Sequence, residues 1–100
     1  MAWKKVIVRT IPNSDTAFEK MSDEVIDYMR TNYDDTGKRT SFSVSSSDDD
    51  LVLTYTSIFR DEASKNEFLA DSTIRTEGIR RNTINASNGI TKENTVDEEV

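Results

Sequence analysis

The sequence predicts an α+β fold in which a four-stranded antiparallel sheet carries two helices on one face. Two apolar segments have the character of strands, and each is followed along the chain by apolar residues at helical spacing; these patterns predict the fold. Leu51–Phe59 contains no Gly, Pro or charge and is rich in β-branched and aromatic residues, which favours a strand over a buried helix. Trp3–Ile11 has the same character. The 100-residue chain has the length of one domain, which we expect to span residues 1–96.

The first predicted strand is Trp3–Ile11, and the first predicted helix comes soon after it. Pro12 and the polar pair Asn13–Ser14 end the strand. We expect one of that pair to be the N-cap of the helix, which should end near Tyr33. Its apolar stripe at three- and four-residue steps is Phe18, Met21, Val25, Tyr28, Met29 and Tyr33.

A hairpin is predicted in the middle of the chain. In Arg39–Ser46 serines alternate with Phe42 and Val44, so one face only is apolar, as expected for an edge strand. The polar turn Ser47–Asp50 then leads into Leu51–Phe59.

The C-terminal third is predicted to form helices and a final strand. Asp61 is the expected N-cap of the first of these helices, with Ala63, Phe68 and Leu69 facing inward. Gly89 comes after the second helix and favours its end, because glycine tolerates the left-handed conformation. The expected elements are a helix over Glu62–Ala70, a break at Asp71–Ser72, a helix over Thr73–Ala86, a strand over Ile90–Val96 and a frayed acidic end at Asp97–Val100.

The order strand, helix, strand, strand, helix, strand predicts a ferredoxin-like βαββαβ fold. Right-handed crossovers place Trp3–Ile11 and Leu51–Phe59 side by side in the centre of the sheet. Both are apolar on both faces, yet the two helices cover one face only. The apolar set with glycine, 34 plus 3 of 100 residues, is also below the usual proportion of about 45–50%. We therefore expect a homodimer in which the open sheet face packs on a second copy.

The chain resembles the dimeric α+β barrel superfamily, which includes the antibiotic-biosynthesis-monooxygenase-like domains. The resemblance lies in the strand-to-helix segment Tyr55–Ala63, the break at Phe68–Asp71, the pair Arg81–Asn82 and the turn Asn88–Ile90. It covers most of the chain in topology. It implies a homodimer with a cleft between sheet and helices, but no particular function, because the superfamily mixes enzymes with proteins of no known activity.

Composition excludes several classes of function. The net charge of −6 opposes non-specific binding to nucleic acid and to anionic membranes, and no apolar run approaches a membrane span. The absence of cysteine excludes disulfides and favours a reducing cytoplasm. The absence of histidine removes the commonest general base and metal ligand, and excludes histidine-ligated haem. We expect no cofactor and no metal site.

Three short motifs are interpreted as polar turns. Asp35–Gly37 is the triplet of aspartic proteases, but it comes after a predicted helix instead of an apolar strand. Gly37–Lys38 lacks the other residues of a phosphate-binding loop. The consecutive carboxylates of Asp48–Asp50 do not converge on a cation.

No catalytic residues are identified, and three hypotheses for function stay open. The first is a non-catalytic homodimeric module that binds a protein or a small molecule. The second is a cofactor-free monooxygenase-like enzyme, or another enzyme acting on a small hydrophobic ligand in the cleft. The third is an acidic mimic of nucleic acid that captures a basic protein, which the interspersed Lys and Arg residues oppose.

The candidate ligand-binding residues of the cleft are Arg9, Tyr55 and Tyr28. They come from a wider set that also includes Trp3, Tyr33 and Phe59. The alternative for the aromatic residues is core packing. The alternative for Arg9 is an ion pair with a carboxylate at a strand end.

Overall fold

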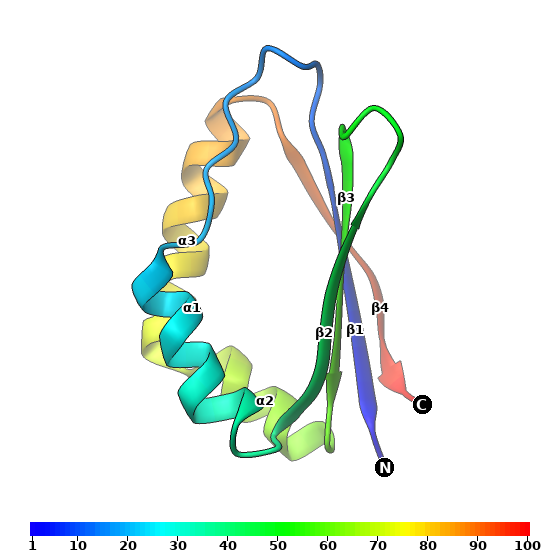
Figure 1. Cartoon of the computed structure of the whole chain (residues 1–100), viewed down its shortest axis with the longest axis vertical. Coiled ribbons are helices and arrows are strands. Elements are labelled where there is room, and N and C mark those ends of the chain that lie inside the picture. Colours follow the sequence, from blue (N-terminus) through cyan, green and yellow to red (C-terminus); the bar gives the residue numbers. More distant parts are fainter.

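Four antiparallel strands form one layer and the helices form a second layer on one side of it (Figure 1). The computed structural model describes all 100 residues. The sheet order is β2-β3-β1-β4, so β1 and β3 are central, and the predicted ferredoxin-like α+β fold is confirmed. The elements are β1 (Trp3–Thr10), α1 (Asp23–Met29), a π-helical turn (Arg30–Asp34), β2 (Arg39–Ser46), β3 (Val52–Phe59), α2 (Glu62–Ala70), α3 (Ser72–Ser87) and β4 (Thr91–Glu99).

The first helix begins later than predicted. The side chain of Asn13 accepts hydrogen bonds from the amide of Asp15 and the hydroxyl of Thr16, which forms a local turn instead of starting a helix. The chain then runs without helix to Ser22, the N-cap of α1, which begins at Asp23. The predicted start at Asn13–Ser14 is therefore wrong.

The hydrophobic core lies at one end of the molecule, where α1 and α2 meet the sheet. The ring of Phe68 packs edge-on against Tyr33 at 5.0 Å and against Phe59 at 5.2 Å between centroids, a favourable aromatic arrangement. Trp3, Met21 and Tyr28 lie against the buried cluster, which consists of Val25, Met29, Tyr33, Phe59, Phe68 and Ile74.

The chain end from Asp97 is not frayed, so that prediction is wrong. β4 continues to Glu99, which pairs with Trp3 of β1. The carboxylate of Asp97 accepts a 2.6 Å hydrogen bond from Trp3 Nε1 and lies 3.7 Å from the ammonium groups of Lys5 and Lys65. These contacts hold in place the acidic residues that composition alone would assign to solvent. The ordered domain therefore extends to Glu99, and the expected domain boundary at residue 96 is three residues too early.

The inner faces of the C-terminal helices are more polar than predicted. In α2, Phe68 is buried as expected. Leu69 and Ala63 are both exposed, which contradicts the prediction that they face inward. The two other buried residues of α2 are Ser64 and Lys65. In α3 the buried residues are Ile74, Glu77, Arg81 and Asn85.

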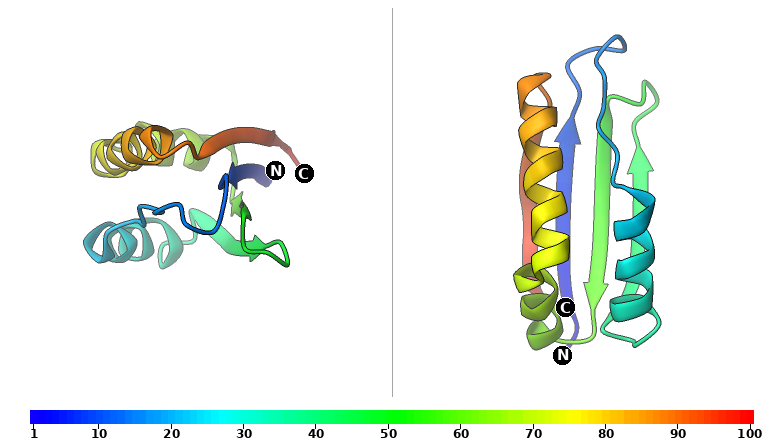
Figure 2. Two further views of the ribbon diagram at one scale, coloured as in Figure 1. Left: turned by 90° about the horizontal axis from the view of Figure 1, so that it is seen from above. Right: turned by 90° about the vertical axis from the view of Figure 1, so that its left-hand side faces the viewer.

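The polar helix faces do not close fully over the sheet. Seen from the helical side, α3 lies over β4 and β1 while α1 lies over β2 (Figure 2). On the inner side of β2, Phe42 and Val44 stay 48% and 50% exposed. The radius of gyration, 13.8 Å, exceeds the value of about 13 Å typical of 100 residues. None of the helices has both the length and the apolar character that a membrane span requires.

Candidate functional site

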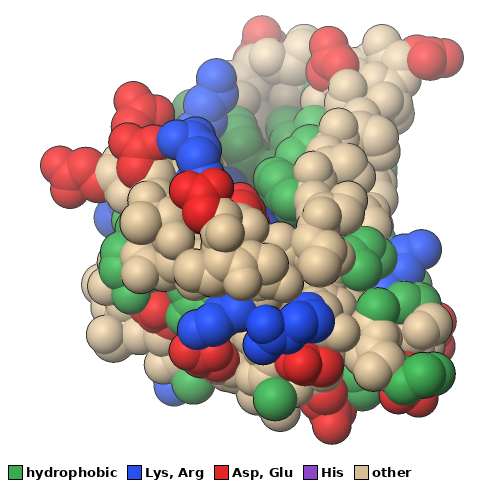
Figure 3. Space-filling model, turned by 60° about the horizontal axis from the view of Figure 1, so that its bottom comes forward, with side chains coloured by type: hydrophobic (Ala, Val, Ile, Leu, Met, Phe, Trp, Pro, Cys, Tyr) green, Lys and Arg blue, Asp and Glu red, His purple; other side chains and the backbone are tan.

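The inner face of the sheet carries an apolar half and a cationic half. Side chains of one parity in each strand share a face, and this face is the one that contains buried Phe59. In one cross-strand row, Leu53 of β3 stands opposite Arg9 of β1, which stands opposite Lys92 of β4. In the next row, Val44, Tyr55 and Ile7 are paired. Figure 3 shows a hollow between the two layers with hydrophobic side chains along its sides.

Arg9 is a buried cation without a carboxylate partner. Arg9 is 5% exposed, and its Nη2 donates a 2.9 Å hydrogen bond to Oδ1 of Asn82 on α3. No acidic group lies within ion-pair distance of Arg9, so the ion pair considered as the alternative for this residue is absent. Burial lowers the pKa of Arg9, and the like charge of Arg81 lowers that pKa further.

Arg81 approaches Arg9 from α3 and is likewise unpaired. It is 8% exposed, and its Nε donates a long 3.4 Å hydrogen bond to the carbonyl oxygen of Glu19. Its guanidinium carbon lies 5.9 Å from the centroid of the Phe18 ring. A guanidinium has five N–H donors, and these contacts use one of them.

Lys92 adds a third positive charge at the edge of this group. The residue as a whole is exposed, but partial burial of its ammonium group lowers the pKa of Lys92, and the charges of Arg9, Lys5 and Arg81 lower it further. We use the name cationic cleft for the region between the sheet and α3 that contains Arg9, Arg81 and Lys92 together with Tyr55 and its apolar neighbours on the inner face.

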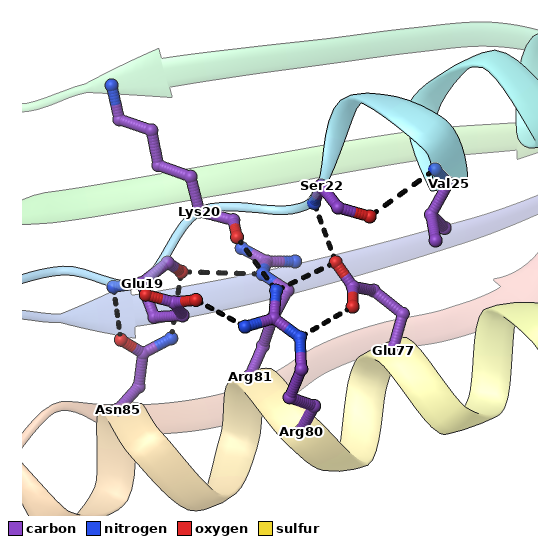
Figure 4. Close-up of polar contacts among 8 residues, drawn as sticks. All are labelled: Glu19, Lys20, Ser22, Val25, Glu77, Arg80, Arg81 and Asn85. Carbon is purple, nitrogen blue, oxygen red and sulfur yellow. Dashed lines mark hydrogen bonds and ion pairs between the residues drawn. The ribbon is translucent and has the colours of Figure 1, made fainter.

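The carboxylates of Glu19 and Glu77 are engaged by another arginine, Arg80, as Figure 4 shows. Arg80 pairs with Glu77 at 2.7 Å and also with Glu19. Glu77 accepts a 2.6 Å hydrogen bond from the amide of Ser22, and its bonds with Arg80 and Ser22 lower the pKa of Glu77 to about 2. Asn85 holds the backbone of Glu19 through both its carbonyl and its amide, at 2.8 and 3.3 Å. These contacts fix the segment before α1 on α3, and they engage Glu19 and Glu77 with Arg80 instead of with Arg9 or Arg81.

The three candidate residues from the sequence separate into two groups. Arg9 and Tyr55 lie on adjacent strands of the same face, and the Tyr55 hydroxyl makes no hydrogen bond within the chain. Tyr28 lies elsewhere: its hydroxyl and that of Tyr33 each donate a 2.7 Å hydrogen bond to Oδ2 of Asp71. Tyr28 therefore serves the packing of α1 on α3, and whether Arg9 and Tyr55 bind a ligand stays a prediction.

Sequence reasoning did not include Arg81, Asn82 or Lys92 among the candidate ligand-binding residues, although Arg81–Asn82 is part of the family resemblance. A signal for Arg81 exists, because it comes after Ile74 and Glu77 at three- and four-residue steps on one helix face. Apolar periodicity alone does not mark that face. For Lys92 the signal is the cross-strand pairing with Arg9, which a single sequence does not reveal.

The cationic cleft offers groups that bind and orient a molecule. Its side chains supply N–H donors, positive charge, one phenol hydroxyl and an apolar wall. No cluster of three or more histidine, cysteine or acidic residues that would hold a metal ion occurs in the chain.

Comparisons with known proteins identify the fold. No protein-family model and no curated protein sequence matches the chain. Among solved structures, the chain is similar to Rv0793 from Mycobacterium tuberculosis, with a TM-score of 0.54, 16% identity and coverage of 98% of this chain and 99% of that one. It is also similar to a dimeric ferredoxin-like protein of unknown function from Jannaschia sp. CCS1, with a TM-score of 0.56, 17% identity and the same coverage of each chain. At these identities the likeness shows a shared ferredoxin-like fold.

Proposed function

We propose that the chain is a homodimeric, non-catalytic module that binds a small molecule in the cationic cleft. The observation that carries this proposal is the incompletely covered inner face of the sheet. There Tyr55, with its free hydroxyl, stands beside the exposed Val44, and the buried Arg9 lies one row along on the neighbouring strand β1. Ligand sites of this kind combine an apolar wall with a few polar groups that fix orientation. The absence of cysteine fits a reducing cytoplasm, which we propose as its location.

The homodimer would form through the outer face of the sheet. No helix covers this face, whose central residues are Val6, Val8, Val52, Thr54, Thr56 and Ile58. All but Val6 remain only partly buried. Four strands of about eight residues span roughly 19 by 26 Å, or about 1,000 Å² for both copies, the lower bound for a specific interface. The Jannaschia protein is described as dimeric, which supports the proposal that this chain dimerises.

Light scattering at micromolar concentration tests the homodimer. We expect a mass of twice 11.4 kDa. Thr56→Lys places a charge at the centre of the outer face and is expected to give monomers, because an unpaired charge in an interface is costly. Asn66→Lys adds the same charge at an exposed site on α2, and this variant should remain dimeric. A monomeric wild-type protein would overturn this part of the proposal.

Ligand-observed NMR with a set of small acidic and neutral aromatic compounds tests the cleft. We expect at least one compound to bind saturably and to lose affinity in Tyr55→Ala. The matched control is Leu69→Ala, since Leu69 is apolar and 41% exposed on α2. Binding that Tyr55→Ala leaves unchanged would place the ligand elsewhere and reject the proposal.

A cofactor-free monooxygenase-like enzyme is the second candidate. It is favoured by the exposure of Phe42 and Val44 on the inner face of β2, because an enzyme for a hydrophobic substrate needs apolar space between sheet and helices. The test is oxygen uptake with hydroxylated polycyclic aromatic compounds. Uptake in proportion to substrate loss, and reduced in Tyr55→Ala, would favour the enzyme over the binding module.

A further inference from the structure

We propose that the ligand of the cationic cleft is a small organic carboxylate with an apolar body, an inference that rests on the proposed function. Its carboxylate lies between Arg9 and Arg81, with Lys92 at the edge. Its apolar body lies on Tyr55 and Val44.

Two buried arginines of the cleft lack a counter-ion. The chain has four buried cationic residues. Two of them have carboxylate partners: Arg39 lies 2.7 Å from Asp34, and Lys65 lies 3.7 Å from Asp97. Arg9 and Arg81 have none, although acidic residues outnumber basic ones by 19 to 13. A buried charge without a partner is costly, so an external anion is the group that would compensate it.

Each of these two arginines has donors that no group of the chain uses. Arg9 uses Nη2 and Arg81 uses Nε for their hydrogen bonds within the chain. No fully buried side-chain nitrogen or oxygen lacks a partner, so the guanidinium nitrogens of these two residues that make no hydrogen bond keep some contact with solvent. A carboxylate matches the planar fork of a guanidinium with two parallel hydrogen bonds.

Apolar surface lies directly beside the positive charge. Leu53 stands opposite Arg9 on β3, and Tyr55 and Val44 lie one row along. An inorganic anion would contact the cationic side chains and leave the apolar side chains exposed to water. An aryl carboxylate uses both halves. A long polyanion such as nucleic acid is disfavoured, because the net charge of the chain is −6.

Isothermal titration calorimetry with a matched pair of probes tests the inference. The probes are 2-naphthoate and its uncharged analogue 2-naphthamide. We expect 2-naphthoate to bind saturably and the amide to bind at least about tenfold more weakly. In Arg9→Gln the affinity for naphthoate should fall by about ten- to a hundredfold, the loss expected for a hydrogen bond to a charged group.

Controls separate the local charge from the total charge. Arg75→Gln removes one positive charge from an exposed site on α3, and its affinity for naphthoate should stay within about twofold of wild type. Circular dichroism of Arg9→Gln should show an unchanged fold. Arg9→Lys should restore part of the lost affinity, because it restores the charge without the fork.

The outcomes that overturn the inference are distinct from those that overturn the proposed function. Equal binding of acid and amide, unchanged in Arg9→Gln, rejects the anion and leaves the cleft as a binding site. Binding of inorganic phosphate as tight as that of naphthoate rejects the apolar body. Binding of neither probe rejects the inference, and if the wider compound set also fails, it rejects the proposed function as well.

Discussion

Replacing Arg9 by Met is expected to stabilise the ligand-free protein. The substitution removes one hydrogen bond, from Nη2 to Asn82 Oδ1, which is worth about 1 kcal/mol. It also removes a charge that is 5% exposed and repelled by Arg81. The effective penalty for burying an ion is several kcal/mol, and access of water through the cleft reduces it here. We therefore expect a net gain of about 1 kcal/mol, or about 4–8 °C in the unfolding temperature.

The matched comparison is Arg39→Met. Arg39 is buried to a similar degree, at 7% exposure. It makes two hydrogen bonds to Asp34, at 2.7 and 3.0 Å, and its guanidinium carbon lies 4.5 Å from the centroid of the Phe42 ring. Breaking a buried ion pair costs about 3–5 kcal/mol, and since Asp34 is partly exposed we expect a loss of about 2 kcal/mol. The same change at two similarly buried arginines should thus have opposite signs.

Urea denaturation at pH 7 measures both effects. The protein concentration must be equal in all samples, because the proposed dimerisation would couple stability to concentration. If Arg9→Met destabilises the protein as much as Arg39→Met does, Arg9 has a structural role and the reasoning about an unpaired cation is wrong.

Three further predictions concern the polar and charged side chains of Glu77, Asp71 and Lys92. The lowered pKa of Glu77, about 2, means that its stabilising contribution is present above the unfolded value of about 4.3 and is lost as pH falls through about 2. Between about pH 4.3 and about pH 2 the free energy of unfolding of the wild type should therefore fall by about 2 kcal/mol relative to that of Glu77→Gln. Urea denaturation at a series of acidic pH values would measure this difference. Asp71→Ala removes the N-cap of α3 and the acceptor of two tyrosine hydroxyls. It should cost about 2–3 kcal/mol in urea denaturation, whereas Ser72→Ala at an exposed neighbouring site should cost less than about 0.5 kcal/mol. The lowered pKa of Lys92, which faces Arg9, Lys5 and Arg81, means that its charged form opposes folding below its native pKa. The free energy of unfolding of the wild type should therefore rise relative to Lys92→Met as pH approaches about 10.4, and an equal pH profile for the two proteins would refute this assignment.

The fold could be predicted because the strands have distinct patterns. β3 is apolar on both faces and β2 on one face only, which identifies a central and an edge strand before any contact is known. The start of α1 could not be predicted, because Asn13 is as good a cap as it is a turn residue. Its side-chain hydrogen bonds with Asp15 and Thr16 decide in favour of the turn.

The candidate site could be predicted only in part, for a physical reason. Arg9 and Tyr55 stand out because neither fits the pattern of a purely apolar strand. The separation of Tyr28 from Arg9 and Tyr55 could not be predicted, because its partner Asp71 is 43 residues away and helical periodicity cannot show a contact at that separation. Arg81 belongs to a helix face that carries Glu77 and Asn85 as well, so a search for apolar stripes passes over it.

The most direct test of ligand binding in the cationic cleft is an NMR titration of the protein with 2-naphthoate, following the backbone amide signals. We predict saturable shift changes concentrated at Arg9, Tyr55, Asn82 and Lys92, the residues that line the cleft from the sheet and from α3. Shift changes confined to the outer sheet face, such as those at Ser43 and Thr56, or the absence of saturable changes, would contradict a binding site there.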